Sequence, residues 1–182
     1  YQSGLNISQD NMKLEDFKWI TEQCKGRCNQ FALGGRGDPD QHEKFEDILK
    51  ICRENNIVPN FTTSGFGMTD DIANTCKKYC GAVAVSWYRN EYTYNAIDLL
   101  LKQKVKTNIH YVLGDNSIDE AIERLEKNDF PKGINAIIFL LHKPVGLGSK
   151  KNMLKFDDQR VKKFFKLFET PHPFKVGMDS CN

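Results

Sequence analysis

Short apolar runs alternate with amphipathic stretches along nearly the whole of this 182-residue chain. The amphipathic stretches carry apolar residues at helical spacing, as at Phe45, Ile48, Leu49 and Cys52. This alternation predicts a parallel sheet with helices packed against it. The runs that predict strands cover residues 30–33, 57–61, 82–85, 105–113, 134–141 and 174–176.

The predicted strands end in polar or glycine residues. These ends recur every 23 to 37 residues, near the ~30 residues of a strand–helix unit. Right-handed crossovers place the carboxyl ends of parallel strands at one edge of the sheet, where a ligand site is expected. The six positions are Gly34, Thr63, Ser86, His110, His142 and Asp179.

We expect residues 1–182 to form one domain. Six strands are fewer than a closed eight-stranded barrel needs, so the options are a doubly wound open sheet or a partial barrel. The helix predicted over residues 14–24 precedes the first visible strand, which implies a strand upstream of Tyr1. Thr69 is a predicted helix N-cap, Gly81 a helix stop, and Ser117 and Glu120 a capping box.

Charge and composition exclude several classes of protein. The net charge of +2 implies no strong attraction to nucleic acid. No apolar run approaches the ~20 residues that span a bilayer, and residues 1–6 do not resemble a signal peptide. Six cysteines are too few for a disulfide scaffold in a chain of this size, which favours reduced thiols in the cytoplasm.

The stretch from Gly34 to Pro39 follows the first strand and is the most informative one. Its glycines allow a ligand to approach the backbone closely. Arg36 can bind a carboxylate or phosphate, and Asp38 can accept from an ammonium or hydroxyl group. A tight Asp-Pro turn explains the stretch equally well. Neither a dinucleotide fingerprint nor a Walker phosphate loop is present.

Further polar residues stand at the next strand ends. Each has an alternative explanation: hydroxyl groups cap helices, an exposed arginine pairs with a nearby acid, and a buried histidine satisfies the core. By strand alternation, the asparagine and histidine of the fourth strand share a face with Val112. The residues are Thr62, Thr63, Ser64, Ser86, Arg89, Asn108 and His110.

These strand ends resemble those of the radical S-adenosylmethionine (radical SAM) enzymes, from about Tyr1 to Ser180. The resemblance implies a partial (β/α)6 barrel in which a Cys-x3-Cys-x2-Cys loop after the first strand holds a [4Fe-4S] cluster. It also implies an electron donor and reductive cleavage of S-adenosylmethionine to a 5′-deoxyadenosyl radical, which abstracts hydrogen from a substrate that the sequence does not identify. The matching stretches are residues 34–39, 59–65, 84–86 and 108–110.

The resemblance also implies which residues bind the cofactor. The family holds the methionine amino group through the backbone of a Gly-Gly-Glu-Pro-like turn. Gly34 and Gly35 match its glycines, whereas Arg36 replaces the usual Glu and is followed by Gly37 and Asp38. The remaining residues would contact the carboxylate and ribose (Thr62, Thr63, Ser64, Ser86 and Arg89) or the adenine and ribose (Asn108 and His110).

The cysteines depart from the family pattern, since the sequence contains no Cys-x3-Cys-x2-Cys. Cys24 and Cys28 have the first spacing, but Phe31 takes the third position. Residues 1–3 resemble those that follow the cluster loop. We therefore expect a fragment that starts after this loop, lacks the first strand and is inactive alone. The lone terminal Cys181 is a candidate ligand for an auxiliary cluster.

Two other classes of function are compatible with the same residues. One is a non-catalytic α/β barrel that binds a small anion or a protein partner. The other is a phosphate-handling barrel enzyme that uses Lys143 and the loop 146–149.

Overall fold

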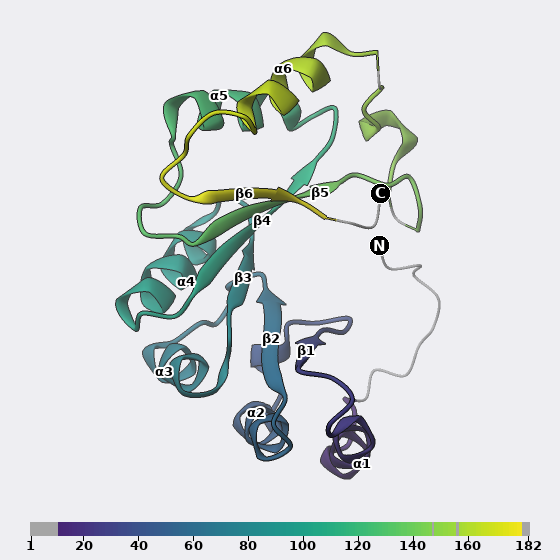
Figure 1. The fold of residues 1–182 in the computed structure, drawn as a ribbon, viewed down its shortest axis with the longest axis vertical. Coiled ribbons are helices and arrows are strands. Elements are labelled where there is room, and N and C mark those ends of the chain that lie inside the picture. The colour runs from purple at the N-terminus through teal and green to yellow at the C-terminus, as the bar shows by residue number, and fades with distance from the viewer. Residues whose placement is uncertain (1–10, 147, 156, 180–182) are drawn as a thin grey trace. The chain divides into compact units, whose positions relative to one another are not determined.

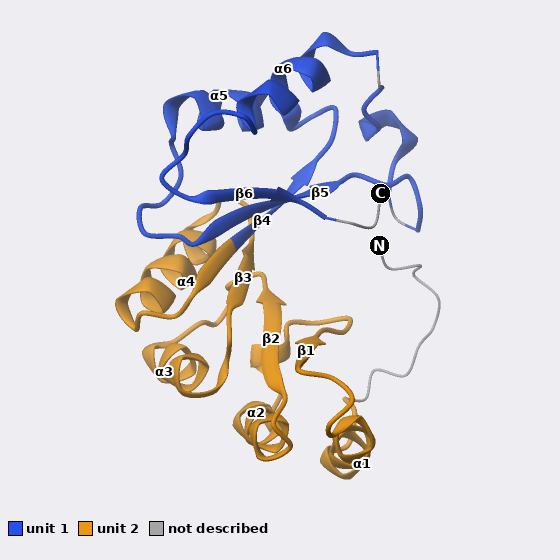
Figure 2. Ribbon diagram, in the orientation of Figure 1, with its two compact units in different colours: residues 1–6, 109–182 blue, residues 7–108 orange. Residues whose placement is uncertain are grey.

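A computed structural model describes residues 11–146, 148–155 and 157–179. By their contacts these residues divide into two compact units, 11–108 and 109–179 (Figure 2). The single domain expected over residues 1–182 stays a prediction. No helix among the described residues is long and apolar enough to cross a membrane.

The unit of residues 11–108 contains three parallel strands, each followed by a helix (Figure 1). Its strands are β1 (Gln30–Leu33), β2 (Val58–Thr63) and β3 (Val83–Ser86), with Leu33 beside Phe61 and Thr62 beside Ala84. The helices are α1 (Leu14–Cys24), the short η1 (Pro39–Gln41), α2 (Phe45–Glu54), α3 (Asp70–Tyr79) and α4 (Glu91–Lys102).

The side chains of β2 alternate between the two faces of this sheet. Pro59, Phe61 and Thr63 are buried, whereas the residues between them are half-buried. The Phe61 ring packs against Phe45 of α2, with centroids 5.3 Å apart, so the buried residues face the helices. The opposite face carries Asn60 and Thr62.

The unit of residues 109–179 has an aromatic core. Phe139 of β5 is fully buried, and its ring centroid lies 4.8 Å from that of Phe164 and 5.2 Å from that of Tyr111. Strand β4 (Thr107–Leu113) crosses the boundary between the units. The other elements are α5 (Ile118–Lys127), β5 (Ala136–Leu141), the short η2 (Lys150–Asn152), α6 (Gln159–Leu167) and β6 (Lys175–Met178), which pairs in parallel with β5.

The alternation of strands and helices is confirmed. The described residues form six strands in the order β1-β2-β3-β4-β5-β6, which is the order of an open parallel α/β sheet. Thr69 caps α3 as predicted, by accepting from the Ile72 N–H at 3.2 Å.

One local prediction is wrong, and another is confirmed for a different physical reason. The Ser117 side chain does not cap α5; its hydroxyl accepts from the Gly114 N–H and lies 2.9 Å from the Val112 carbonyl. Helix α3 ends at Tyr79 with Cys80 as its C-cap, so Gly81 directly follows the helix end as predicted, but without a positive φ. A Cβ at Gly81 would lie 2.5 Å from the Val58 side chain, so close packing explains this glycine.

Candidate functional site

The glycine loop after β1 leaves its backbone uncovered. Gly34, Gly35 and Gly37 are exposed, and a Cβ added at any of them would meet no atom within 4 Å. None of the three has a positive φ. Neither crowding nor backbone conformation therefore requires glycine here, whereas an exposed backbone is what close contact with a ligand needs.

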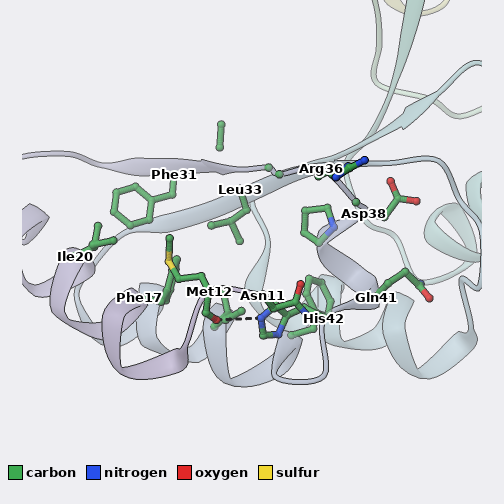
Figure 3. A pocket seen from close by; sticks show the side chains of 17 residues that line it. Asn11, Met12, Phe17, Ile20, Phe31, Leu33, Arg36, Asp38, Gln41 and His42 are labelled. Atoms are coloured by element: carbon green, nitrogen blue, oxygen red, sulfur yellow. Dashed lines mark hydrogen bonds between the residues drawn. The ribbon is translucent and has the colours of Figure 1, made fainter. Parts of the chain in front are cut away.

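A cavity of about 930 Å³ extends from α1 to this loop. Figure 3 shows Ile20 and Phe31 at one end and Arg36 and Asp38 at the other. The apolar end belongs to the packing of β1 against α1, since Phe31 makes an edge contact with Phe17 at 6.3 Å. We therefore place the candidate site at the polar end.

Asp38 connects the glycine loop to the end of β2. Its Oδ2 accepts a 3.0 Å hydrogen bond from the Ser64 N–H and a second one from the Ser64 hydroxyl. Sequence analysis predicted both residues for the site, and the structure brings them together. Asp38 thus accepts from a hydroxyl group, and this hydroxyl group belongs to Ser64 of the protein itself.

The three successive hydroxyl residues have different surroundings. Thr62 is half-buried on the face of β2 that points away from the helices. Thr63 is fully buried, and its Oγ1 accepts from the Gly65 N–H at 2.9 Å. Ser64 lies in the loop and binds Asp38. Thr62 and Ser64 are thus partly exposed, whereas Thr63 is not, and contact of all three with a ligand stays a prediction.

Sequence analysis missed Asp40 in η1, which is only 5% exposed. Burial raises the pKa of its carboxyl, although a hydrogen bond with Thr63 lowers it. Among the described residues, no group donates to Asp40 Oδ1. The neighbouring Gln41 donates to the Phe66 carbonyl at 3.0 Å. Asp38, Asp40 and Gln41 therefore join the segment after β1 to the segment at the end of β2.

The raised pKa of Asp40 predicts a specific pH dependence. Between its ordinary pKa of 3.8 and the raised value, the folded protein keeps a proton that the unfolded chain releases. The free energy of unfolding should therefore fall as pH rises through this window, by at most ~1.4 kcal/mol per pH unit. Asp40→Asn should remove this slope in urea unfolding from pH 4 to 7.

The control for this experiment is Asp157→Asn, which removes an exposed carboxylate. It should keep the wild-type slope. An unchanged slope in Asp40→Asn would contradict the assignment.

Ser86 and Arg89 lie at the end of β3. Ser86 is half-buried, and its carbonyl accepts from the Tyr88 N–H at 2.9 Å. Arg89 is exposed, has a φ of 62° and donates from Nη1 to the Trp87 carbonyl at 3.1 Å. A positive φ is uncommon for a residue other than glycine, and such residues are often found at functional sites.

Asn108 and His110 share one face of β4 with Val112, as predicted, because burial alternates along the strand. Burial lowers the pKa of His110, while the Asp179 carboxylate opposes this effect. A neutral imidazole is therefore favoured. Asn108 belongs to the unit of residues 11–108 and His110 to the other.

The loop proposed for phosphate follows β5. The Nε2 atom of His142 is 2.9 Å from the Ser149 carbonyl oxygen, and Gly146 has a φ of 59°. Lys143 is half-buried. Residue 147 lies outside the described residues.

The cysteines do not provide a metal site in the described part of the chain. Five of them are free, and no three His, Cys, Asp or Glu residues there are grouped to hold a metal ion. Burial raises the pKa of Cys52 to about 11, and a hydrogen bond with Cys80 together with burial raises that of Cys76. Cys181 lies outside the described residues.

The six parallel strands that alternate with helices form a fold that solved structures share. No family model and no curated protein matches the sequence. Among solved structures, Streptococcus suis SuiB bound to S-adenosylmethionine is similar, with a TM-score of 0.72, 16% identity, and coverage of 98% of this chain and 46% of SuiB.

Two further structures have the same fold. Native anSMEcpe with bound AdoMet has a TM-score of 0.72 and 18% identity, covering 97% of this chain and 58% of that one. SuiB bound to the precursor peptide SuiA has a TM-score of 0.68 and 18% identity, covering 97% and 44%. The chain thus spans about half the length of the structures it matches.

Proposed function

We propose that this chain forms the S-adenosylmethionine-binding part of a radical SAM enzyme. The observation that carries the proposal is the uncovered backbone of Gly34, Gly35 and Gly37 at the polar end of a cavity. The fold supports it, since SuiB and anSMEcpe have this fold and were solved with S-adenosylmethionine. When bound, the cofactor supplies the adenosyl group that radical chemistry uses.

The residues of the glycine loop would hold the methionine end of the cofactor. The Gly34 and Gly35 carbonyls can accept from its ammonium group, and Arg36 can bind its carboxylate. Asp38 orients the loop, because Ser64 binds its carboxylate. Contacts of the other residues with the carboxylate, ribose or adenine stay predictions (Thr62, Thr63, Ser64, Ser86, Arg89, Asn108 and His110).

The donor set of these residues does not fit a [4Fe-4S] cluster. The sequence contains no Cys-x3-Cys-x2-Cys, and no three His, Cys, Asp or Glu residues of the described part are grouped to hold a metal ion. We therefore derive no reductive step from this chain and assign it the binding of the cofactor.

We propose a peptide as the substrate class. SuiB was solved with its precursor peptide SuiA on a fold that this chain shares. An electron donor would be the second partner. The five free cysteines of the described part support a reducing compartment, which we propose to be the cytoplasm.

Titration calorimetry with S-adenosylmethionine tests the cofactor proposal. Gly35→Val should weaken binding about tenfold or more, a change of ~1.4 kcal/mol, because the new side chain covers the backbone that the ligand approaches. The thermal unfolding temperature should not change, because a Cβ at Gly35 meets no atom within 4 Å. Equal affinity of both proteins, or no binding by wild type, would contradict the proposal.

A further inference from the structure

A second cavity, of about 520 Å³, lies within residues 109–179 beside the turn between β4 and α5. Four basic side chains and two carboxylates line it, together with the apolar Met153 and Leu154. Its volume falls within the range of pockets that bind ligands. None of the residues proposed for the cofactor lines this cavity.

The loop that carries the lysines is held against β4 and β5. The Asp115 N–H donates to the Asn152 carbonyl at 2.9 Å, and His142 Nε2 lies 2.9 Å from the Ser149 carbonyl. Gly114 permits this approach, because a Cβ there would lie 2.8 Å from the Asn152 oxygen. The cavity therefore has a defined wall.

The two carboxylates that line the cavity, Asp115 and Asp158, form ion pairs with the guanidinium group of Arg160. Arg160 Nη2 lies 2.5 Å from Asp115 Oδ1 and 2.7 Å from Asp158 Oδ2. The same guanidinium reaches Asp119 through Nη1 at 3.0 Å. Hydrogen bonds from Arg160 lower the pKa of Asp158, so this carboxyl stays ionised at neutral pH.

The three lysines of the cavity are differently placed. Lys150, Lys151 and Lys155 are exposed, and none of them forms an ion pair with the residues that the structure describes. Three exposed ammonium groups thus line the cavity, and the charge of Lys155 also acts on the Asp158 carboxylate, whose pKa it lowers. Met153, which is 45% exposed, and Leu154 lie between them in sequence and offer apolar contact.

We propose that this lysine cavity binds an acidic segment of the peptide substrate, an inference that rests on the proposed function. Glutamate or aspartate side chains would pair with Lys150, Lys151 and Lys155, and apolar neighbours would contact Met153 and Leu154. A free phosphate would pair with the lysines only and would make no use of the apolar Met153 and Leu154. The alternation of charged and apolar residues around the cavity therefore favours a peptide.

Fluorescence anisotropy tests the proposal with a labelled twelve-residue peptide of alternating Glu and Leu. The triple variant Lys150→Gln, Lys151→Gln and Lys155→Gln should bind this peptide about tenfold more weakly than wild type. A peptide in which Gln replaces Glu should lose the same fold in affinity for wild type.

The matched control is the triple variant Lys162→Gln, Lys166→Gln and Lys175→Gln. It removes three exposed lysines of the same unit that lie outside the cavity and changes the net charge equally. It should bind the Glu peptide like wild type. If both triple variants bind the Glu peptide equally weakly, the net charge of the protein explains the effect and the proposal is overturned. Displacement of the peptide by micromolar inorganic phosphate would also overturn it.

Calorimetry with S-adenosylmethionine separates this proposal from the proposed function. The Lys150, Lys151 and Lys155 variant should bind the cofactor like wild type. If peptide binding depends on the cavity lysines but the cofactor does not bind, the proposed function fails and the anionic site stands. If the cofactor binds and the cavity lysines have no effect on the peptide, only the lysine cavity is refuted.

Discussion

Asp38→Ala is expected to lower the free energy of unfolding by about 2 kcal/mol, because hydrogen bonds to a charged group are lost. The variant removes the acceptor of both the Ser64 N–H and the Ser64 hydroxyl. It also releases the glycine loop from the end of β2, so the affinity for S-adenosylmethionine should fall about tenfold. Urea unfolding and calorimetry measure the two effects.

Two further variants show whether the contact with Ser64 causes these effects. Asp38→Asn keeps an oxygen that can accept from the Ser64 N–H, so its losses should be smaller than those of Asp38→Ala. Ser64→Ala removes only the hydroxyl. The double variant Asp38→Ala, Ser64→Ala should lose less free energy of unfolding than the sum of the losses of the two single variants. Additive losses would show that the two residues act independently.

Gly65→Val should destabilise the protein by roughly 3 kcal/mol, the largest effect on stability that we expect. Gly65 has a φ of 89°, which a β-branched residue strongly disfavours. A Cβ there would also lie 2.8 Å from both the Ala96 Cβ and the Tyr92 carbonyl oxygen. The variant must move α4 away from the end of β2, and urea unfolding measures the cost.

Gly37→Val is the matched control for this experiment. Gly37 has no positive φ, and a Cβ there meets no atom within 4 Å. Its stability should stay within about 0.5 kcal/mol of wild type. If both variants lose the same stability, a general cost of replacing loop glycines explains the result better than packing against α4.

The sequence predicts the fold well because strand and helix periodicity depend on burial. The first strand, Gln30–Leu33, has the predicted bounds, and the first helix, Leu14–Cys24, covers the residues on which its prediction was centred. Local hydrogen bonds are harder to predict. Ser117 has the spacing of a capping box, but its hydroxyl instead lies among the backbone groups of the preceding turn.

The candidate site is only partly predictable, because its side-chain partners are distant in sequence. The run Thr62, Thr63 and Ser64 predicts hydroxyl groups at the strand end, but not which of them is buried. Asp40 carries no local signal beyond its place after Pro39, a residue favoured at the first position of a helix. Its hydrogen-bond partner Thr63 is 23 residues later in the chain.

The contacts of Ser64 and Gly65 connect the loop after β1 to the start of α4. Asp38 accepts hydrogen bonds from Ser64, and the next residue, Gly65, packs against Tyr92 and Ala96 of α4, the second helix after it in the chain. We therefore expect a ligand that restrains the first loop to restrain the amide groups at the start of α4 as well. Amide hydrogen exchange at the start of α4 can thus report occupancy of a pocket that α4 does not line.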